Sequence, residues 1–245
     1  MTPVTTMFAL AAVTLATLSF VVAPYGRHAR RGWGPTLPSR IGWIAMESPA
    51  VVAFTAFYLL GHHRAEAGPM VLLGMWLAHY VHRAFVFPFA MRTNDKRMPV
   101  AIVAMGFSFN VFNAWVNARW ISEHGEYPAG WLVDPRFVLG VTIFFVGLAG
   151  NVRADRRLMA LRAPGERGYK VPQGGLHAYV SSPNYLGEIV EWLGWALATW
   201  SLPGLAFAVY TIANLAPRAL HHHAWYRRTF PDYPRNRKAL LPFLL

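Results

Sequence analysis

Seven apolar stretches of membrane-spanning length dominate this sequence, and short segments rich in arginine, proline and glycine separate them. A helix needs about 20 predominantly apolar residues to cross the hydrocarbon core of a bilayer. Backbone polar groups must be satisfied internally there, which restricts spanning structures to helices and closed barrels. The sequence therefore predicts an all-α membrane protein with seven transmembrane helices. The predicted spans cover approximately residues 4–23, 41–60, 69–90, 100–119, 137–152, 186–200 and 202–220.

The positive charges predict the orientation of these helices. All but four of the 23 lysines and arginines follow the first, third or fifth predicted span or lie at and beyond the C-terminal end of the seventh, which places them on one side of the membrane. The four exceptions are Arg64, Arg83, Arg119 and Arg136. Because cytosolic loops carry an excess of lysine and arginine, we expect the N-terminus outside and the C-terminus in the cytosol. A count that differed by one span would scatter these charges over both sides.

Composition excludes several classes of function. A formal net charge of +12 can indicate nucleic-acid binding. However, 55% of the residues are hydrophobic and only 14% are charged, against about 25% in a soluble domain, so we expect no nucleic-acid partner. The absence of cysteine excludes disulfides, thiolate metal sites and a cysteine nucleophile. The triplet at 221–223 is three consecutive histidines, which point in different directions on a helix, and we expect no metal site.

Ionisable side chains inside two predicted spans are functional candidates, because such groups are costly at bilayer depth. Glu47 lies in the second span, and two readings of it stay open. It could pair with an arginine between helices, or it could remain protonated and donate a hydrogen bond. The third span holds His79, Tyr80 and Arg83. On a helix His79 and Arg83 share a face, and Tyr80 is expected to point elsewhere.

The segment 152–185 is longer than a simple connector between helices. Between positions 165 and 175 it combines glycines, basic residues and a tyrosine. Backbone amides and arginines suit phosphates, so this composition favours an anionic nucleotide; a basic loop against lipid is the alternative. The sequence contains neither a G-x-G-x-x-G fingerprint after a strand nor a Walker A motif, so a Rossmann site and a P-loop are not predicted.

Several long strings near the C-terminus strongly resemble the steroid 5-alpha-reductase family. They are PQGGL at 172–176, SPNYLGEIVEW at 182–192, ALATWSLP at 196–203, RALHHH at 218–223 and DYP at 232–234. The resemblance is dense over residues 150–245. Earlier in the chain it is patchier, although 43–49 and 79–87 also match.

The resemblance implies a seven-helix enzyme that reduces the 4,5 double bond of a 3-keto-4-ene steroid with NADPH, delivering hydride to C5. By position, Glu47 and Tyr80 match the catalytic pair that holds the C3 carbonyl, and Trp43 and Trp192 match walls that flank the steroid. Ten further residues match the cofactor side: Asn151, Asp155, Arg162, Tyr169, Lys170, Asn184, Glu188, Arg218, His222 and Tyr226.

The predicted spans and the resemblance together imply a single membrane domain over 1–245. Residues 1–120 would supply the substrate-side helices, and 121–245 the cofactor-binding helices and cytosolic loops. The expected partners are a steroid and membrane lipid, with the protein a monomer. Composition favours a bacterial cytoplasmic membrane; a eukaryotic protein would be expected in the endoplasmic reticulum.

Three departures from the family pattern bear on substrate and cofactor. Met46 stands where the family commonly has glutamine, and Lys170 stands where an arginine is familiar, which keeps the charge but loses bidentate geometry. The segment 91–99 aligns poorly, so contact between Arg97 and a cofactor phosphate stays open.

Two other functions remain as alternatives. One is an S-adenosylmethionine-dependent membrane methyltransferase of the isoprenylcysteine carboxyl methyltransferase type, and the other is a non-enzymatic lipid transporter. The cofactor that stabilises the protein distinguishes these functions.

Overall fold

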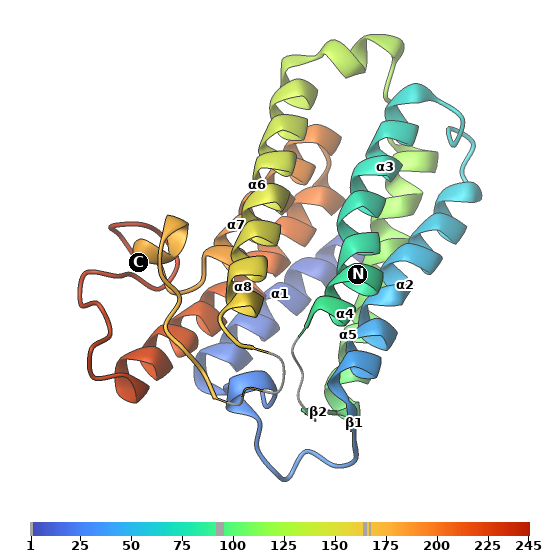
Figure 1. Cartoon of the computed structure of the whole chain (residues 1–245). Coiled ribbons are helices and arrows are strands. Elements are labelled where there is room, and N and C mark those ends of the chain that lie inside the picture. Colours follow the sequence, from blue (N-terminus) through green and yellow to red (C-terminus); the bar gives the residue numbers. More distant parts are fainter. Residues whose placement is uncertain (1, 92–95, 164–165, 167) are drawn as a thin grey trace.

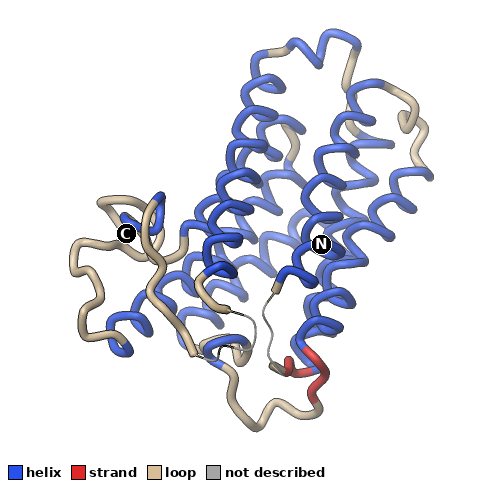
Figure 2. Tube along the Cα trace, in the orientation of Figure 1, coloured by secondary structure: helices blue, strands red, loops and turns tan. Residues whose placement is uncertain are grey.

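The structure is a computed structural model, and it describes residues 2–91, 96–163, 166 and 168–245. Long helices form most of the described chain, and a smaller lobe of loops lies at one end of the bundle (Figures 1 and 2). The α-helices are α1 (Pro3–Phe20), α2 (Ser39–Leu59), α3 (Ala67–Val81), α4 (Phe87–Ala90), α5 (Val100–Arg119), α6 (Pro135–Ala160), α7 (Pro183–Thr199) and α8 (Leu202–Thr229). Strands β1 (Thr36–Pro38) and β2 (Arg97–Pro99) form a small antiparallel pair.

Five helical segments are long and apolar enough to cross a membrane: Pro3–Phe20, Ser39–Leu59, Ala67–Ala90, Val100–His124 and Pro135–Ala160. They coincide with the first five predicted spans, and they support an integral, all-α membrane protein. Helix α7 has 17 residues, which is at the lower limit of the length that a span needs. Helix α8 has 28 residues, but arginines and histidines occupy its C-terminal half. The count of seven spans and the orientation stay predictions.

Proline and capping residues explain where several helices begin. Proline occupies the first or second position of α1, α6, α7 and α8, where its missing N–H costs no hydrogen bond. The Asp134 carboxylate accepts from the Arg136 backbone N–H at 2.8 Å, and the Ser201 hydroxyl accepts from the Gly204 N–H at 3.0 Å. The helical starts of α6 and α8 are therefore local properties of the sequence.

The prediction of a connecting segment over 152–185 is wrong at its start, because those residues are helical. Helix α6 continues past position 152 to Ala160, so the connection to α7 runs only from 161 to 182. The prediction relied on apolar residues, which mark the part of a helix that lies in a membrane. Arginine, alanine, leucine and methionine favour continuation of the helix beyond that part. The extension matters because it carries Asp155 on a helical backbone.

Helices α6 and α7 approach each other closely because glycines line their contact. A Cβ atom at Gly147 or Gly194 would collide with the backbone of the facing helix, and one at Gly187 would lie 2.5 Å from the Asn151 nitrogen. Small residues of this kind let transmembrane helices pack backbone against backbone. The contact brings the polar residues of α6 beside those of α7.

Buried aromatic side chains fill the centre of the bundle. Phe54 stacks on Trp76 with ring centroids 4.2 Å apart, and the Trp76 indole N–H donates to the Ala50 carbonyl at 2.8 Å. Trp192 and Trp195 pack against Trp76 at 5.4 and 5.3 Å. This cluster forms a rigid wall behind the polar residues of α3.

The C-terminal tail folds back on the loop between α6 and α7. The buried Arg237 side chain donates to the Pro172 carbonyl at 3.1 Å and to the Gln173 side chain at 3.2 Å. The Ser181 hydroxyl lies 2.7 Å from both His223 Nδ1 and the Tyr233 hydroxyl. These contacts hold the loop against the end of α8.

Candidate active site

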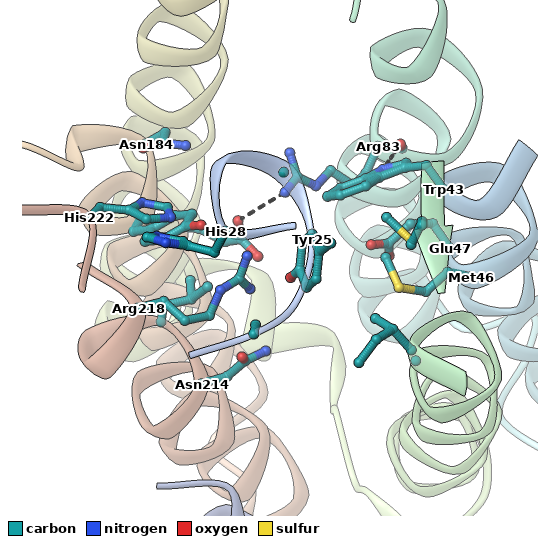
Figure 3. Close-up of a pocket in the computed structure, with 18 of the residues that line it drawn as sticks. Tyr25, His28, Trp43, Met46, Glu47, Arg83, Asn184, Asn214, Arg218 and His222 are labelled. Carbon is teal, nitrogen blue, oxygen red and sulfur yellow. Dashed lines mark hydrogen bonds and ion pairs between the residues drawn. The ribbon is translucent and has the colours of Figure 1, made fainter. Parts of the chain in front are cut away.

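A cavity of about 860 Å³ lies between the helices, close to the upper size of ligand pockets. Residues from α1, α2, α3, α5, α6, α7 and α8 line it, together with the loop that follows α1. Figure 3 shows two ends of different character: Trp43, Met46, Glu47 and Arg83 lie at one, and His28, Arg218 and His222 at the other. A single compartment therefore joins an apolar region to a cationic one.

Glu47 sits at the first end on α2. Its Oε2 accepts from the Asn110 side-chain amide at 3.3 Å, and the same amide group donates to the Met46 carbonyl at 2.7 Å. Within the described ranges no ion pair joins Glu47 to an arginine. An amide that donates to one carboxyl oxygen leaves the other oxygen available to a ligand in the cavity.

Tyr80 and His79 both line this cavity, so the expectation that Tyr80 points away from His79 is wrong. Their rings are 4.7 Å apart and nearly perpendicular. The helix passes into a π-helical turn at His82–Val86, directly after these residues. Such a wide turn is frequent at functional sites.

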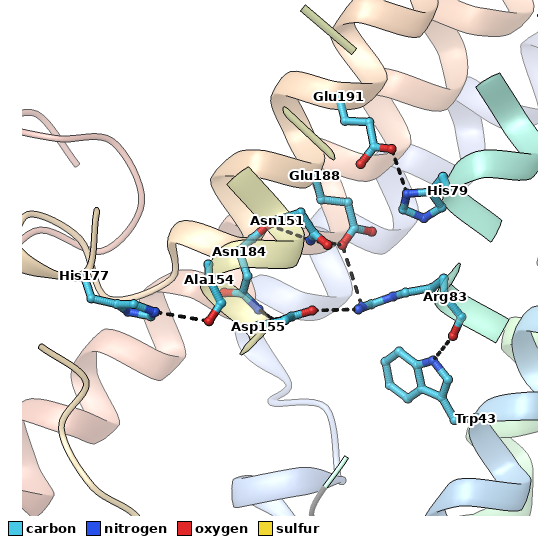
Figure 4. Close-up of polar contacts among 10 residues, drawn as sticks. All are labelled: Trp43, His79, Arg83, Asn151, Ala154, Asp155, His177, Asn184, Glu188 and Glu191. Carbon is cyan, nitrogen blue, oxygen red and sulfur yellow. Dashed lines mark hydrogen bonds and ion pairs between the residues drawn. The ribbon is translucent and has the colours of Figure 1, made fainter. Parts of the chain in front are cut away.

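Arg83 connects three helices through buried ion pairs (Figure 4). Its Nη1 donates to Asp155 Oδ2 at 3.1 Å, and its Nη2 lies 3.7 Å from Glu188 Oε2. Asp155 also accepts from the Asn184 amide at 2.9 Å, and the Asn151 amide donates to the Asn184 carbonyl at 3.0 Å. Buried charges persist only when they are paired in this manner.

A second buried pair joins α3 to α7. His79 Nδ1 lies 2.9 Å from Glu191 Oε1, and both side chains are almost inaccessible to solvent. Glu191 Oε2 has no hydrogen-bond partner among the described residues. The Trp192 ring packs edge-on against His79 at 4.7 Å.

The other end of the cavity is cationic and aromatic. His28 stacks on His222 with centroids 5.4 Å apart, and the Arg218 guanidinium lies 5.1 Å from the Tyr25 ring. Burial, followed by the nearby Arg27, lowers the pKa of His28 to about 4. Arg27 Nη1 and His28 Nε2 are buried and have no hydrogen-bond partner among the described residues. The unsatisfied Arg27 donor fits an anionic ligand, and the neutral His28 can donate to the same ligand in the tautomer that carries hydrogen on Nε2.

Tyr169 gathers further positive charge at this end. Lys96 Nζ donates to its hydroxyl at 2.9 Å, and the guanidinium groups of Arg27 and Arg162 lie 5.4 and 5.7 Å from its ring. Lys170 pairs with Glu166 at 2.6 Å. The aromatic ring and the cations around it are suited to hold a nucleotide by stacking and charge.

The resemblance assigns fourteen residues to the substrate and the cofactor, and twelve of them line the cavity. The exceptions lie one layer behind it. Asn151 holds the backbone of Asn184, and Trp192 packs behind His79 and Tyr80.

Arg97 does not line the cavity, and its guanidinium instead binds the Thr36 hydroxyl at 2.8 Å and the Thr36 carbonyl at 2.6 Å. Of the poorly aligned segment around it, residues 92–95 lie outside the described chain, as do 164, 165 and 167 of the glycine-containing loop.

Sequence reasoning left several lining residues unassigned: Tyr25, Arg27, His28 and Lys96. The signal for the first three is the string Y-G-R-H directly after the first apolar stretch, in which Gly26 adopts a positive φ of 64°. Glycine permits that turn, which directs the basic side chains back under the bundle. Arg83 was recognised as a buried arginine, but its acidic partners are not apparent from sequence spacing.

Comparison with known proteins identifies the family. A family model described as 3-oxo-5-alpha-steroid 4-dehydrogenase matches residues 96–245. Steroid 5-alpha-reductase DET2 of Gossypium hirsutum is 42% identical, over 98% of this chain and 95% of the relative. For 3-oxo-5-alpha-steroid 4-dehydrogenase 1 of Bos taurus the identity is 42%, over 97% and 93%. For 3-oxo-5-alpha-steroid 4-dehydrogenase 2 of Sus scrofa it is 47%, over 85% and 82%.

These matches confirm the resemblance that the C-terminal strings indicate, and they extend it over most of the chain. The protein is therefore an oxidoreductase, and it belongs to the 3-oxo-5-alpha-steroid 4-dehydrogenase family.

Proposed function

We propose that this protein uses NADPH to reduce the 4,5 double bond of 3-keto-4-ene steroids, yielding 5-alpha-3-ketosteroids. The observation that carries the proposal is the single cavity that joins Glu47 and Tyr80 to a cationic end with unpaired donors. An apolar substrate and a charged cofactor must meet for such a reaction, and the two ends suit one each. The names of the relatives point to the same chemistry.

The cationic end fits a phosphorylated dinucleotide. Arg27 Nη1 is a buried donor without a partner in the described chain, His28 Nε2 is a buried ring nitrogen without one, and Arg162, Lys170 and Arg218 add charge around them. When bound there, NADPH would supply the hydride. We assign its binding to the ten residues named from the resemblance, with Asn151 acting through Asn184, and we add Arg27 and His28 to that set.

The apolar end suits a steroid whose C3 carbonyl points toward Glu47 and Tyr80. The Tyr80 hydroxyl and a protonated Glu47 would both donate to the carbonyl oxygen and stabilise the enolate that forms as C5 is reduced. Donors of this type contribute roughly 3–4 kcal/mol each to transition-state stabilisation. Asn110, which donates to Glu47 Oε2, orients the carboxyl for this task.

Trp43 and Trp192 have separate roles at the steroid end of the cavity. The Trp43 indole N–H donates to the Arg83 carbonyl at 3.1 Å, and its ring lies 4.7 Å from the Arg83 guanidinium. A ring fixed in this way can flank the steroid while it shields the ionic network. Trp192 supports the steroid site from behind Tyr80, with ring centroids 5.6 Å apart.

The membrane arrangement belongs to the same proposal. Seven spans with an external N-terminus and a cytosolic C-terminus would put the cationic end on the side where NADPH is available. One membrane domain over 1–245 would then use 1–120 for substrate and 121–245 for cofactor. We propose a monomer in the bacterial cytoplasmic membrane, or in the endoplasmic reticulum of a eukaryote.

Purified protein in detergent tests the function. With NADPH and a 3-keto-4-ene steroid, we expect oxidation of NADPH and a product heavier by two hydrogens. The comparisons do not favour the methyltransferase and transporter alternatives. Stabilisation by S-adenosylmethionine, with no reduction of the enone, would overturn the proposal in favour of methylation. Absence of any cofactor effect would favour transport.

A further inference from the structure

Reduction of an enone requires a proton as well as a hydride, and the proposed roles of Glu47 and Tyr80 leave the proton at C4 without a donor. C4 is two bonds away from the C3 carbonyl oxygen. A donor to C4 must therefore lie beside the groups that hold that oxygen. His79 satisfies this condition, because it lines the same cavity and its ring centroid is 4.7 Å from that of Tyr80.

The hydrogen bond to Glu191 determines which nitrogen of His79 can act. Nδ1 is held by Glu191 Oε1 at 2.9 Å, and Glu191 does not line the cavity. Nε2 has no hydrogen-bond partner among the described residues, and it is not fully buried. A carboxylate on one ring nitrogen fixes the tautomer and orientation and stabilises the imidazolium. Nε2 is therefore the nitrogen that can exchange a proton with a ligand.

Other ionisable groups near the carbonyl are engaged elsewhere. Arg83 is bound to Asp155 and Glu188 and does not release its proton. The carboxylate of Glu188 faces that arginine, and Asp155 also accepts from Asn184. His28 and His222 are stacked together at the opposite end of the cavity (Figure 3).

We infer that His79, positioned by Glu191, protonates C4 of the steroid through Nε2; this inference rests on the proposed reductase function. After hydride arrives at C5, the enolate electron pair at C4 takes the Nε2 proton. A C4–H bond forms, the Nε2–H bond breaks, and the C3 carbonyl is restored. The imidazolium becomes neutral imidazole, the enolate loses its negative charge, and a proton from bulk solvent returns to Nε2. Glu191 keeps the Nδ1 hydrogen bond throughout.

The reverse of this step gives a test that does not depend on reduction. Neutral His79 should remove a C4 proton from a saturated 3-ketosteroid bound with NADP⁺, so the wild-type protein should exchange C4 hydrogen for deuterium in D₂O. General acid–base groups contribute about 10²–10⁴-fold. We expect His79→Gln to slow this exchange at least ~100-fold while steroid affinity stays within about twofold. Mass spectrometry of the recovered steroid measures the exchange.

Glu191→Gln tests the positioning residue separately. The glutamine amide oxygen can still accept the Nδ1–H bond, so the fold is preserved while the negative charge is lost. We expect kcat for reduction and the exchange rate to fall at least ~10-fold, with KM for the steroid nearly unchanged. A residue that serves only to link α3 to α7 would not produce this separation of kcat from KM.

His63→Gln is the matched control. His63 also pairs with a glutamate, Glu66, at 2.6 Å, but this pair lies in the exposed loop between α2 and α3 and does not line the cavity. We expect its exchange and reduction rates to equal those of the wild type.

The label on C4 gives the second readout. In D₂O the wild-type protein should place deuterium on one face of C4, whereas residual turnover by His79→Gln should label both faces. Wild-type exchange or one-face labelling in His79→Gln would overturn the role of His79, as would a wild-type protein that reduces the enone without accelerating exchange. Failure of the wild type to reduce the enone would instead count against the proposed function.

Discussion

Arg83 donates a hydrogen bond to Asp155 at 3.1 Å, although the two residues lie 72 positions apart in the sequence. Both side chains are largely buried. The pair fixes the π-helical turn that follows α3 against α6 (Figure 4), and both residues line the cavity. It therefore links the substrate side of the proposed site to its cofactor side.

Replacing one member of this pair should destabilise the protein strongly. Asp155→Asn leaves the Arg83 guanidinium without its closest carboxylate, and breaking a buried ion pair typically costs about 3–5 kcal/mol. Thermal unfolding in detergent measures the loss of stability. Arg136→Gln, which removes a more exposed pair with Asp134 at 2.8 Å, should change Tm little. Equal effects of the two variants would argue against a structural role for the buried network.

The two groups assigned to the C3 carbonyl should affect turnover rather than cofactor binding. Tyr80→Phe and Glu47→Gln each remove or weaken one donor, so we expect kcat to fall about 10²–10³-fold. The NADPH Kd should stay within about twofold, because Glu47 lies at the other end of the cavity (Figure 3) and we assign Tyr80, which lines the cavity beside His79, to the steroid carbonyl. Parallel measurements of steady-state rates and NADPH titration check this. Wild-type turnover in both variants would remove Glu47 and Tyr80 from the mechanism.

The loop after α1 should contribute directly to cofactor affinity. Arg27→Gln removes a cation whose buried Nη1 has no partner among the described residues, and we expect the NADPH Kd to rise at least about tenfold, or about 1.4 kcal/mol. Arg97→Gln serves as the control, because that guanidinium binds Thr36 outside the cavity. Calorimetric titration distinguishes the two variants. If Arg97→Gln raised the NADPH Kd more than Arg27→Gln, the cofactor phosphate would bind near Arg97 and not near Arg27.

Close packing of α6 on α7 should make one glycine sensitive to a single methyl group. Gly147→Ala forces a Cβ into the α7 backbone, and overpacking of this type costs about 1–3 kcal/mol. Gly74→Ala in α3 is the control, because nothing lies within 4 Å of its added Cβ. Alanine favours helix there, so stability should be equal or slightly greater. Thermal unfolding of the two variants provides the comparison.

His177 should make the C-terminal lobe sensitive to acid. Burial lowers the pKa of His177 from 6.5 to about 4, so the folded state keeps the ring neutral while the unfolded state takes up a proton. Stability should therefore fall as the pH drops from about 6.5 to about 4 and level off below that. His177→Gln lacks this contribution. The difference in stability between the wild-type protein and the variant should therefore change between about pH 6.5 and about pH 4. Limited proteolysis of the lobe at several pH values measures the effect, and parallel profiles would contradict it.

Local features of the sequence were sufficient to predict the helices. Long apolar stretches predict where the five helical segments lie that are long and apolar enough to cross a membrane, and Pro183 and Ser201 stand at helix starts that the structure contains. Both signals act over a few residues, so neither depends on the rest of the fold. The end of α6 could not be predicted in this way, because apolar residues indicate the part of a helix that lies in a membrane and not where the helix ends.

Only the tertiary structure decided which polar side chains meet. Nothing in the spacing of His79 and Glu191, 112 positions apart, shows that they share a hydrogen bond. Their contact depends on the packing of α3 against α7, just as the entry of Arg27 into the cavity depends on the turn at Gly26 after α1. Sequence periodicity assigns a residue to a helix, but the partner across an interface is set by how whole helices pack, and that is a non-local property.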